Sequence, residues 1–429
     1  MNQNYAVSSH PRILFLSLAN DIGSERVAAE MIKYGIECGV MSPQTFNCMK
    51  IVGLSRRFTL PNDFGIRLST LFVRHRLNAA FKTWVPDLVL PLDDPSSWLL
   101  RSLAIDPRIS PQLRSLLINS LGAPNGYCAA IERLEFMNLV ESLGLRKPLH
   151  REIPDCETAL RTADELGYPV VVKHEHTTGG VGVSIAHTPE AVSYLLTQGR
   201  APSLLKALRS SAKQRLYGLA GLRSWHPATT ILQSYIPGIP AFRTVAAWKG
   251  QVLAGVSFAA EKIFPEPTGA STVVRKIENA EIDAATEKVT LALGCSGFVS
   301  YDFILDERNG HASIIEMNAR SVGTTHLGRL FGSDVCGALA EILTGRSSGR
   351  HAAQFQMAAL FPKEIVRDVE SPYLKSDAVY HDVPDDQPEL MRAYLRSFKK
   401  KYPENFMQRR FISYCPRHGL DRSDHVATE

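Results

Sequence analysis

The 429-residue sequence lacks the features that mark membrane proteins, secreted proteins and zinc-binding modules. No apolar run approaches the roughly 20 residues needed to cross a bilayer, and the start MNQNYAVSSHP has no secretory hydrophobic segment. The 7 cysteines are scattered and include no C-x-x-C pair, which argues against a zinc site and against a disulfide framework. We therefore expect a cytoplasmic protein in a reducing compartment, with no membrane partner.

A large excess of one charge is also missing. The chain has 48 Lys and Arg against 43 Asp and Glu, a net charge of +5, and the two signs are mixed along its length. No nucleic-acid-binding motif accompanies this weak positive charge, so we expect small anionic ligands and no nucleic acid. The hydrophobic fraction of 45% is typical of globular proteins, and the length predicts two or three packed units.

The beginning of the chain has the pattern of an open parallel α/β layer. Residues 12–17 (RILFLS) predict a buried strand, residues 23–34 a helix, and residues 39–41 the next short strand. A helix at 67–84 and a proline-bounded strand at 86–91 predict a second round of the same alternation.

Two aspartates follow the strand at 86–91. Asp93 and Asp94 lie just past its carboxyl end, where open α/β sheets commonly bind ligands. The alternative is that Asp94 only caps a helix that starts at Pro95. The sequence leaves both interpretations open.

Helices and strands continue in a mixed order. Further helices are predicted at 131–145, 156–167, 283–293 and 389–400. Further strands are predicted at 169–173, after the Gly-rich loop through Ile185, within 229–256 around a Lys249–Gly250 turn, and on both sides of Asn309–Gly310. Residues 200–227 are basic and weakly periodic, which indicates an insertion or a mobile linker.

Residues 168–183 (YPVVVKHEHTTGGVGV) combine a strand, a lysine and a Gly-rich loop. Gly179, Gly180 and Gly182 let backbone N–H groups approach anionic oxygens, and Lys173 supplies a point charge for a phosphate. The segment does not match G-x-x-x-x-G-K-[ST], which excludes a P-loop. The alternative is a Gly-rich surface hairpin with a snorkelling lysine.

A second cluster of polar residues lies on the predicted strand pair at 298–320. Alternation places Asp302 on the face opposite to Tyr301 and Phe303, and Glu316 and Asn318 on one face of the second strand. Hard oxygen ligands on one face suit Mg²⁺, which keeps waters and takes few protein ligands. The alternative is a solvated polar face.

Asp302 and Glu316 meet only if the hairpin has the right register. A two-residue Asn309–Gly310 turn would place Asp302 opposite Met317. We therefore predict a loop of three or five residues with a bulge.

These segments, in this order, resemble the ATP-grasp superfamily. Its members carry a strand lysine with a Gly-rich lid, an adenine-binding hinge like residues 233–238 (QSYIPG), and a metal-binding strand pair that ends in E-x-N-x-R, here residues 316–320. The resemblance covers residues 131–344 and implies an α/β fold with an α+β ATP-grasp core. It implies an N-terminal domain at 1–123, an ATP-grasp domain at 124–345 with a mobile lid at 151–232, and a C-terminal extension at 346–429.

The resemblance also implies the ligands and their sites. ATP would bind through Lys173 and the mobile lid, and Mg²⁺ (one or two ions, with Mn²⁺ as an alternative) through three side chains of the strand pair, with Arg320 near the transferring phosphate. The lid residues are Gly179, Gly180, Gly182 and Val183, the adenine hinge is Gln233, Ser234, Tyr235 and Ile236, and the metal ligands are Asp302, Glu316 and Asn318.

Some positions depart from the usual pattern of the superfamily. Arg133 stands where many relatives have a first phosphate-binding lysine, and arginine also pairs with phosphate. The segment after Gly238 lacks the acid that often binds the ribose. Lys262, Arg275 and Lys276 fall in the stretch that lines the phosphate and substrate pocket in relatives, although exposed strand cations are the alternative. Lys262 and Arg275 join Arg320 as the expected catalytic residues.

The resemblance predicts a ligase that phosphorylates a carboxylate and couples it to an amine, with release of ADP and phosphate. Two alternatives remain, an enzyme of the same superfamily acting on another oxygen acceptor and an ATP-binding regulatory protein without turnover. A nicotinamide-dependent Rossmann enzyme is disfavoured, because the turn at 18–23 (LANDIG) has no G-x-G-x-x-G. Small-molecule substrates and a possible homodimer complete the expectation.

Overall fold

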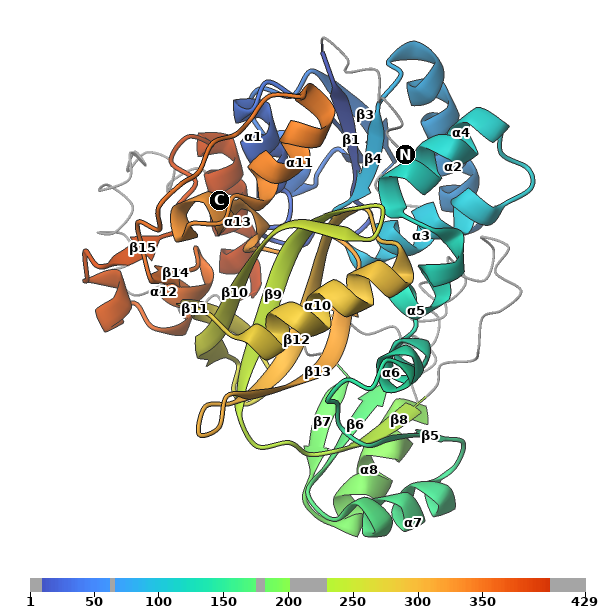
Figure 1. Ribbon diagram of the computed structural model, residues 1–429, viewed down its shortest axis with the longest axis vertical. Coiled ribbons are helices and arrows are strands. Elements are labelled where there is room, and N and C mark those ends of the chain that lie inside the picture. Colours follow the sequence, from blue (N-terminus) through green and yellow to red (C-terminus); the bar gives the residue numbers. More distant parts are fainter. Residues whose placement is uncertain (1–9, 62–65, 175–181, 201–229, 402–429) are drawn as a thin grey trace.

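The computed structural model describes residues 10–61, 66–174, 182–200 and 230–401. Within these ranges the chain forms three sheets, two in one body and a third that projects from it (Figure 1). No helix in these ranges is both long and apolar enough to cross a bilayer. Gly179, Gly180 and the predicted linker from residue 201 onward lie outside the described residues.

The N-terminal sheet is parallel in all its pairings, with the order β3-β2-β1-β4. Alternate residues of β1 face different hydrophobic clusters, Ile13 and Phe15 on one side and Leu14 and Leu16 on the other. A strand buried on both faces has a continuous apolar sequence, which explains the run RILFLS and confirms the predicted parallel layer. The elements are β1 (Arg12–Leu16), α1 (Arg26–Lys33), β2 (Glu37–Pro43), η1 (Asn47–Lys50), β3 (Arg56–Leu60), α2 (Ile66–Thr83), β4 (Leu88–Pro91), α3 (Asp94–Ile105) and α4 (Pro111–Leu121).

The central sheet has seven strands in the order β13-β12-β9-β10-β11-β14-β15. One face packs against α10, and the other faces the N-terminal sheet and α11. Helix α10 begins after Asn279, whose side chain accepts a hydrogen bond from Ile282 N, and ends at the left-handed Gly294. The elements are β9 (Ile239–Trp248), β10 (Gln251–Phe264), β11 (Ala270–Ile277), α10 (Ala280–Leu293), β12 (Gly297–Asp306), β13 (His311–Asn318), η3 (Thr325–Phe331), α11 (Val335–Thr344), β14 (Met357–Ala359) and β15 (Val379–His381).

The predicted odd-numbered loop of the β12–β13 hairpin is wrong. Asp306 pairs with His311, so the loop has an even number of residues, 307–310. The register shifts inside the strands instead, because Phe303 pairs with Ile314 while Asp302 pairs with Glu316. Ile315 is therefore the extra residue of a β-bulge, and this bulge brings the two carboxylates opposite each other.

The third sheet is antiparallel, with the order β5-β8-β6-β7. Helices α7 and α8 cover one face through a separate hydrophobic cluster, and Figure 1 shows this unit at the far end from the N-terminal sheet. It connects to the body through α5, α6 and the segment between β8 and β9. The elements are η2 (Pro124–Gly126), α5 (Tyr127–Ile131), α6 (Arg133–Ser142), β5 (His150–Ile153), α7 (Cys156–Leu166), β6 (Val170–His174), β7 (Val183–Ala186), α8 (Pro189–Arg200) and β8 (Thr230–Ser234).

The C-terminal part of the chain returns to both larger sheets. Strand β14 pairs with β11, and α13 (Pro388–Lys401) packs its buried Leu390 and Tyr394 into the cluster that contains β1 and β2. Figure 1 shows α13 beside the N-terminal sheet. Two short elements, α12 (Lys363–Arg367) and η4 (Pro372–Leu374), lie between them in sequence.

A buried polar network lies where α13 meets the start of α1. Gly23 N donates to Glu25 Oε2 (2.8 Å) and to the Tyr394 hydroxyl (3.1 Å). Asp382 accepts from Arg26 and pairs with His326 Nε2 at 2.8 Å. Burial raises the pKa of Glu25 to about 7, against the hydrogen bonds that lower it.

Replacing Leu390 by alanine should destabilise the protein by about 2 to 5 kcal/mol, because the side chain is 0% exposed in the shared cluster. Urea denaturation measures this change in the free energy of unfolding. Leu291→Ala is the matched control, since Leu291 is 66% exposed on α10 and its loss should cost little. Equal effects of the two substitutions would contradict the packing of α13.

The raised pKa of Glu25 gives a pH-dependent stability. The folded protein binds this proton more tightly than the unfolded chain, so stability is fully present below pH 4.5 and is lost as the pH rises to 7. Glu25→Gln has no carboxylate to ionise and should not show this loss. The free energy of unfolding of the wild type should therefore fall relative to that of Glu25→Gln by about 1.4 kcal/mol per pH unit across this interval. Urea denaturation from pH 4.5 to about 8 tests this.

The control for Glu25 is Glu278→Gln, since the Glu278 side chain is 89% exposed. This variant should follow the pH profile of the wild type. If Glu25→Gln does so too, the burial of a proton-binding Glu25 is wrong.

Candidate active site

Two carboxylates meet on one face of the central sheet. Asp302 of β12 pairs with Glu316 of β13, and Asn318 Nδ2 donates to Asp302 Oδ2 at 3.1 Å. The neighbours Tyr301 and Phe303 are 0% exposed on the opposite face, in the cluster with α10. The predicted alternation is therefore confirmed along β12 and from Glu316 to Asn318 of β13, and the three expected metal ligands lie together.

Burial and the facing Glu316 raise the pKa of Asp302 to about 7, against Asn318, Arg320 and Lys173, which lower it. The facing carboxylates of Asp302 and Glu316 repel each other, and a divalent cation between them would remove the repulsion. Two acids and an amide are too few to enclose a metal, and the described residues contain no group of three or more His, Cys, Asp or Glu placed to hold one. The donor set fits Mg²⁺, which shares its coordination with phosphates and water.

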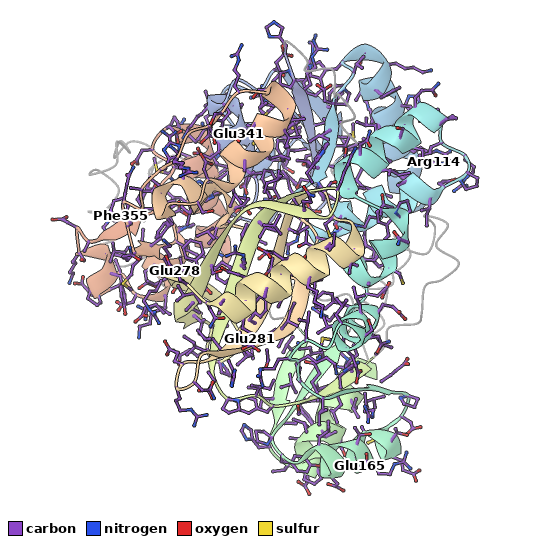
Figure 2. All side chains as sticks on the ribbon, viewed as in Figure 1. Arg114, Glu165, Glu278, Glu281, Glu341 and Phe355 are labelled. Atoms are coloured by element: carbon purple, nitrogen blue, oxygen red, sulfur yellow. The ribbon has the colours of Figure 1, made fainter. Side chains whose placement is uncertain are left out.

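Glu281, at the start of α10, holds the β12–β13 hairpin in place. Its Oε2 accepts from Ala312 N of β13 at 2.9 Å, and its Oε1 pairs with Arg146 at 2.8 Å. Figure 2 shows Glu281 on α10, in front of the central sheet. Helix α10, which covers the face opposite to Asp302, thus helps to fix the strand that carries Glu316.

Asp302, Glu316 and Asn318 form a polar face of the central sheet, and Arg320 lies at the end of this face. A side chain of the N-terminal domain binds Arg320. Its Nε and Nη2 donate to the two carboxylate oxygens of Asp94 at 2.6 and 3.0 Å, a bidentate pair. Arg320 Nη2 also lies 3.3 Å from Asn318 Oδ1. Although burial opposes the charge, Asp94 raises the pKa of Arg320 above its usual value. The guanidinium is therefore permanently charged and oriented next to the candidate metal ligands.

The two readings of the aspartate pair are now resolved. Asp93 is the N-cap of α3, since its Oδ1 accepts from Ser96 N at 2.9 Å. Its Oδ2 accepts from Leu18 N and Ala19 N in the loop after β1. Asp94 therefore does not cap the helix but orients Arg320.

Helix α3 also holds the backbone of the E-M-N-A-R segment. Ser97 Oγ donates to Ala319 O at 2.9 Å, and the buried Arg101 Nη1 reaches the same oxygen at 3.3 Å. Sequence reasoning missed Ser97 and Arg101, because neither belongs to a motif. Helical spacing from Asp94 was the available signal, since residues three or four apart share a face.

Arg133 connects the third sheet to the carboxylate pair. Its Nη2 binds Glu316 Oε1 at 2.9 Å, and its Nη1 donates to His174 O at 2.7 Å. Lys173, the neighbouring residue on β6, is 5% exposed and close enough to lower the pKa of Asp302. The structure thus brings Arg133 and Lys173 to the face that carries Asp302 and Glu316.

The remaining expected nucleotide-binding residues lie on the strands of the third sheet or just after them. Val183 begins β7 opposite Lys173, and Gly182 O accepts from His174 N at 3.0 Å. Gln233 and Ser234 end β8, and Tyr235 and Ile236 continue into the connection to β9. Gly238 is required there, because a Cβ would lie 2.5 Å from Leu305 O. Segment 235–238 is therefore the direct covalent link between the third sheet and the central sheet.

Of the expected catalytic residues, Arg275 lies on the other face of the sheet, and Lys262 makes no polar contact with this cluster in the described residues. Arg275 pairs in register with Ala259 and lies on the face of Ile277, which packs in the α10 cluster, opposite to the face of Asp302. Its charge is matched by Glu307 at 2.8 Å. Lys262 lies at a register shift of β10, and no hydrogen bond or ion pair within the described ranges joins it to the cluster.

Comparison with known proteins finds similarity to one group of ATP-dependent enzymes. Residues 132–209 match the family model of the carbamoyl-phosphate synthase L chain, ATP binding domain. The large chain of carbamoyl phosphate synthase from Thermomicrobium roseum is 26% identical over 250 residues, 57% of this chain and 21% of that protein. The one from Ralstonia nicotianae is 41% identical over 66 residues, 15% of this chain and 6% of that protein. The chain therefore spans at most about a fifth of the length of these relatives.

Solved structures share the fold over most of the chain. The biotin carboxylase domain of the Hydrogenobacter thermophilus 2-oxoglutarate carboxylase has a TM-score of 0.57 at 16% identity, over 80% of this chain and 71% of its own. The N5-carboxyaminoimidazole synthetase of Staphylococcus aureus has a TM-score of 0.56 at 14% identity, over 81% of both chains. With its parallel N-terminal domain and a strand pair that ends in E-M-N-A-R, the chain has the fold of the ATP-grasp superfamily, and residues 132–209 match the ATP-binding domain of one of its families.

Proposed function

We propose that the protein is an ATP- and Mg²⁺-dependent ligase that converts a carboxylate to an acyl phosphate and joins it to an amine. The observation that carries this proposal is the single polar face formed by Asp302, Glu316, Asn318 and the oriented Arg320. The biotin carboxylase neighbour is described with MgADP, which supports the same pair of ligands here. We also propose that it acts in the cytoplasm on small molecules.

The proposed reaction has two balanced steps. A carboxylate oxygen attacks the γ-phosphorus of ATP, the bond to the bridging oxygen breaks, and ADP leaves. The amine then attacks the acyl carbon, phosphate leaves with the bonding electron pair, and the amine proton passes to water as the amide forms. Neither step needs a nucleophilic side chain, so positioning and charge neutralisation are the work of the protein.

The residues of this chain would divide that work. Asp302 and Glu316 would hold Mg²⁺, which when bound neutralises phosphate charge. Lys173 and Arg133 would bind phosphate oxygens from the side of the third sheet. Arg320, fixed by Asp94, would bind the phosphoryl group as it moves from ADP to the acceptor.

Bicarbonate is a second candidate for the phosphoryl acceptor. The biotin carboxylase neighbour is described in complex with a bicarbonate anion. The same polar face would serve, because the attacking group is again a carboxylate-type oxygen. ADP release with bicarbonate as the sole acceptor would favour this candidate over an organic carboxylate.

Glu316→Ala should lower ADP release by about 100-fold or more, because it removes one of the two carboxylates that would hold Mg²⁺. The assay measures ADP formed from ATP and Mg²⁺ with pooled carboxylates, bicarbonate and amines. Glu165→Ala is the control, since Glu165 is exposed on α7, far from the polar face (Figure 2). Undiminished turnover in Glu316→Ala would refute the metal site, and the absence of any ATP binding by the wild type would refute the function.

Asp94→Asn should lower kcat by about 10- to 100-fold while MgADP affinity changes little, because Arg320 loses its charged partner but the nucleotide ligands remain. Steady-state kinetics and calorimetric titration with MgADP separate the two effects. Asp377→Asn, on an exposed turn, is the control. A loss of MgADP affinity equal to the loss of kcat would contradict a role in positioning Arg320 alone.

A further inference from the structure

Lys363 is a cation without a direct partner beside the candidate active site. It is the first residue of α12, and within the described ranges it makes no hydrogen bond and no ion pair with a carboxylate. Burial lowers its pKa, against Asp382 and Asp21, which raise it. A partly buried ammonium that is left unpaired costs free energy, so its retention needs an explanation.

The backbone around Lys363 is rigidly mounted. Glu364 is 0% exposed and accepts from Thr272 Oγ1 of β11 at 2.7 Å. It also pairs with Arg367 at 2.6 Å and accepts from the Ser371 hydroxyl. Leu360 N donates to Thr272 O at 2.8 Å, so both sides of Lys363 are tied to the central sheet. The lysine is therefore held in place by the fold.

Two other segments meet at the Lys363 ammonium. A Cβ added to Gly323 would lie 3.9 Å from Lys363 Nζ and 3.5 Å from Ile22 O. A Cβ added to Gly23 would lie 3.0 Å from the Gly323 Cα. The loop after Arg320, the loop after β1 and the start of α12 thus converge, although they are far apart in sequence.

Three of the carboxylates near Lys363 already have partners within the protein, and Asp21, which also raises its pKa, forms no ion pair with it. Asp382 binds Arg26 and His326, Glu25 accepts from Gly23 N, and Asp94 binds Arg320. Lys363 alone among the cations of this junction has no carboxylate within ion-pair distance in the described part of the chain. An anion from outside the chain would complete the set.

The order of residues indicates which substrate would bring this anion. Arg133 and Lys173 lie at the end of the polar face that joins the third sheet, Asp302 and Glu316 follow, and then Arg320. Lys363 lies past Arg320, where the electrostatic influence of Arg320 still lowers its pKa. A group bound at Lys363 would therefore lie next to the acyl phosphate and away from the nucleotide. The attacking amine must occupy a position of this kind.

We propose that Lys363 is a specificity-determining residue that binds an anionic group on the amine substrate, so that the substrate is an amino acid or a phosphorylated amine rather than a neutral amine. This inference rests on the proposed ligase function. The shared chemistry is a negative charge separated from the attacking nitrogen by a few bonds. Loop residues after β1 and after Arg320 would flank this group.

The first test needs no known substrate. Lys363→Met removes an unpaired charge, so the melting temperature of the ligand-free protein should stay equal or rise by a few degrees. Inorganic phosphate or acetate, added against chloride at equal ionic strength, should raise the melting temperature of the wild type by more than that of Lys363→Met, which keeps Arg133, Lys173 and Arg320. Equal shifts in the two proteins would overturn the proposal. Lys375→Met is the control, since Lys375 pairs with Glu370 at the surface. A marked fall in melting temperature for Lys363→Met would show a structural role and overturn the proposal.

The second test uses turnover with pooled amino acids, phosphorylated amines and their neutral amide or dephosphorylated counterparts. Lys363→Met should raise KM for the anionic amine about 10- to 100-fold and leave KM for its neutral counterpart unchanged, and Lys363→Arg should restore most of the difference. MgADP affinity should be unchanged in all variants. Comparing the amino-acid and phosphorylated arms distinguishes carboxylate from phosphate.

The failures of the two proposals can be told apart. Equal loss for the anionic and the neutral amine, or a wild type that prefers the neutral amine, would overturn the role of Lys363 while the ligase function stands. Loss of MgADP binding by the wild type would instead overturn the function.

Discussion

The partly buried ion pair between Arg320 and Asp94 joins residues that are 226 positions apart and ties the end of the central strand pair to helix α3. Arg320 is the last residue of the E-M-N-A-R segment, and Asp94 is the first residue of α3 in the N-terminal domain. Removing Asp94 would leave the guanidinium of Arg320, whose side chain is 12% exposed, without its carboxylate partner, which costs more than the loss of a fully exposed pair. The hydrogen bonds from Ser97 and Arg101 to Ala319 reinforce the same junction. The candidate active site is thus built across a domain boundary, and its geometry depends on both sides.

Charge distribution along the polar face explains why this site suits a polyanion with a metal. Asp302 and Glu316 repel each other, while Arg133, Lys173 and Arg320 lie around them. Arg133 neutralises Glu316 directly. Nucleotide phosphates would give Arg133 and Lys173 new partners and would leave the two carboxylates to a cation, so the same set of charges remains balanced in both states.

The C-terminal part of the chain contributes to this arrangement as well as to stability. Strand β14 extends the central sheet, α13 packs into the core of the N-terminal sheet, and α12 between them carries Lys363 to the end of the polar face. Because Glu364, Asp382 and Tyr394 are each engaged in buried polar contacts, the segment is fixed at several points. We therefore see residues 357–397 as part of the framework of the site, although the sequence offered no motif there.

The sequence by itself determined the parallel N-terminal layer, the faces of β12 and β13 and the superfamily, because side-chain alternation, apolar runs and the E-M-N-A-R segment are local patterns. It did not determine the register of the hairpin, since the bulge at Ile315 compensates an even-numbered loop and leaves no mark in composition. It also could not separate Arg275 from Asp302, which lie on opposite faces of one sheet, or show what Asp94 and Arg101 contact. The contacts of Asp94 and Arg101 join residues more than 200 positions apart, and only tertiary packing decides which distant charges meet.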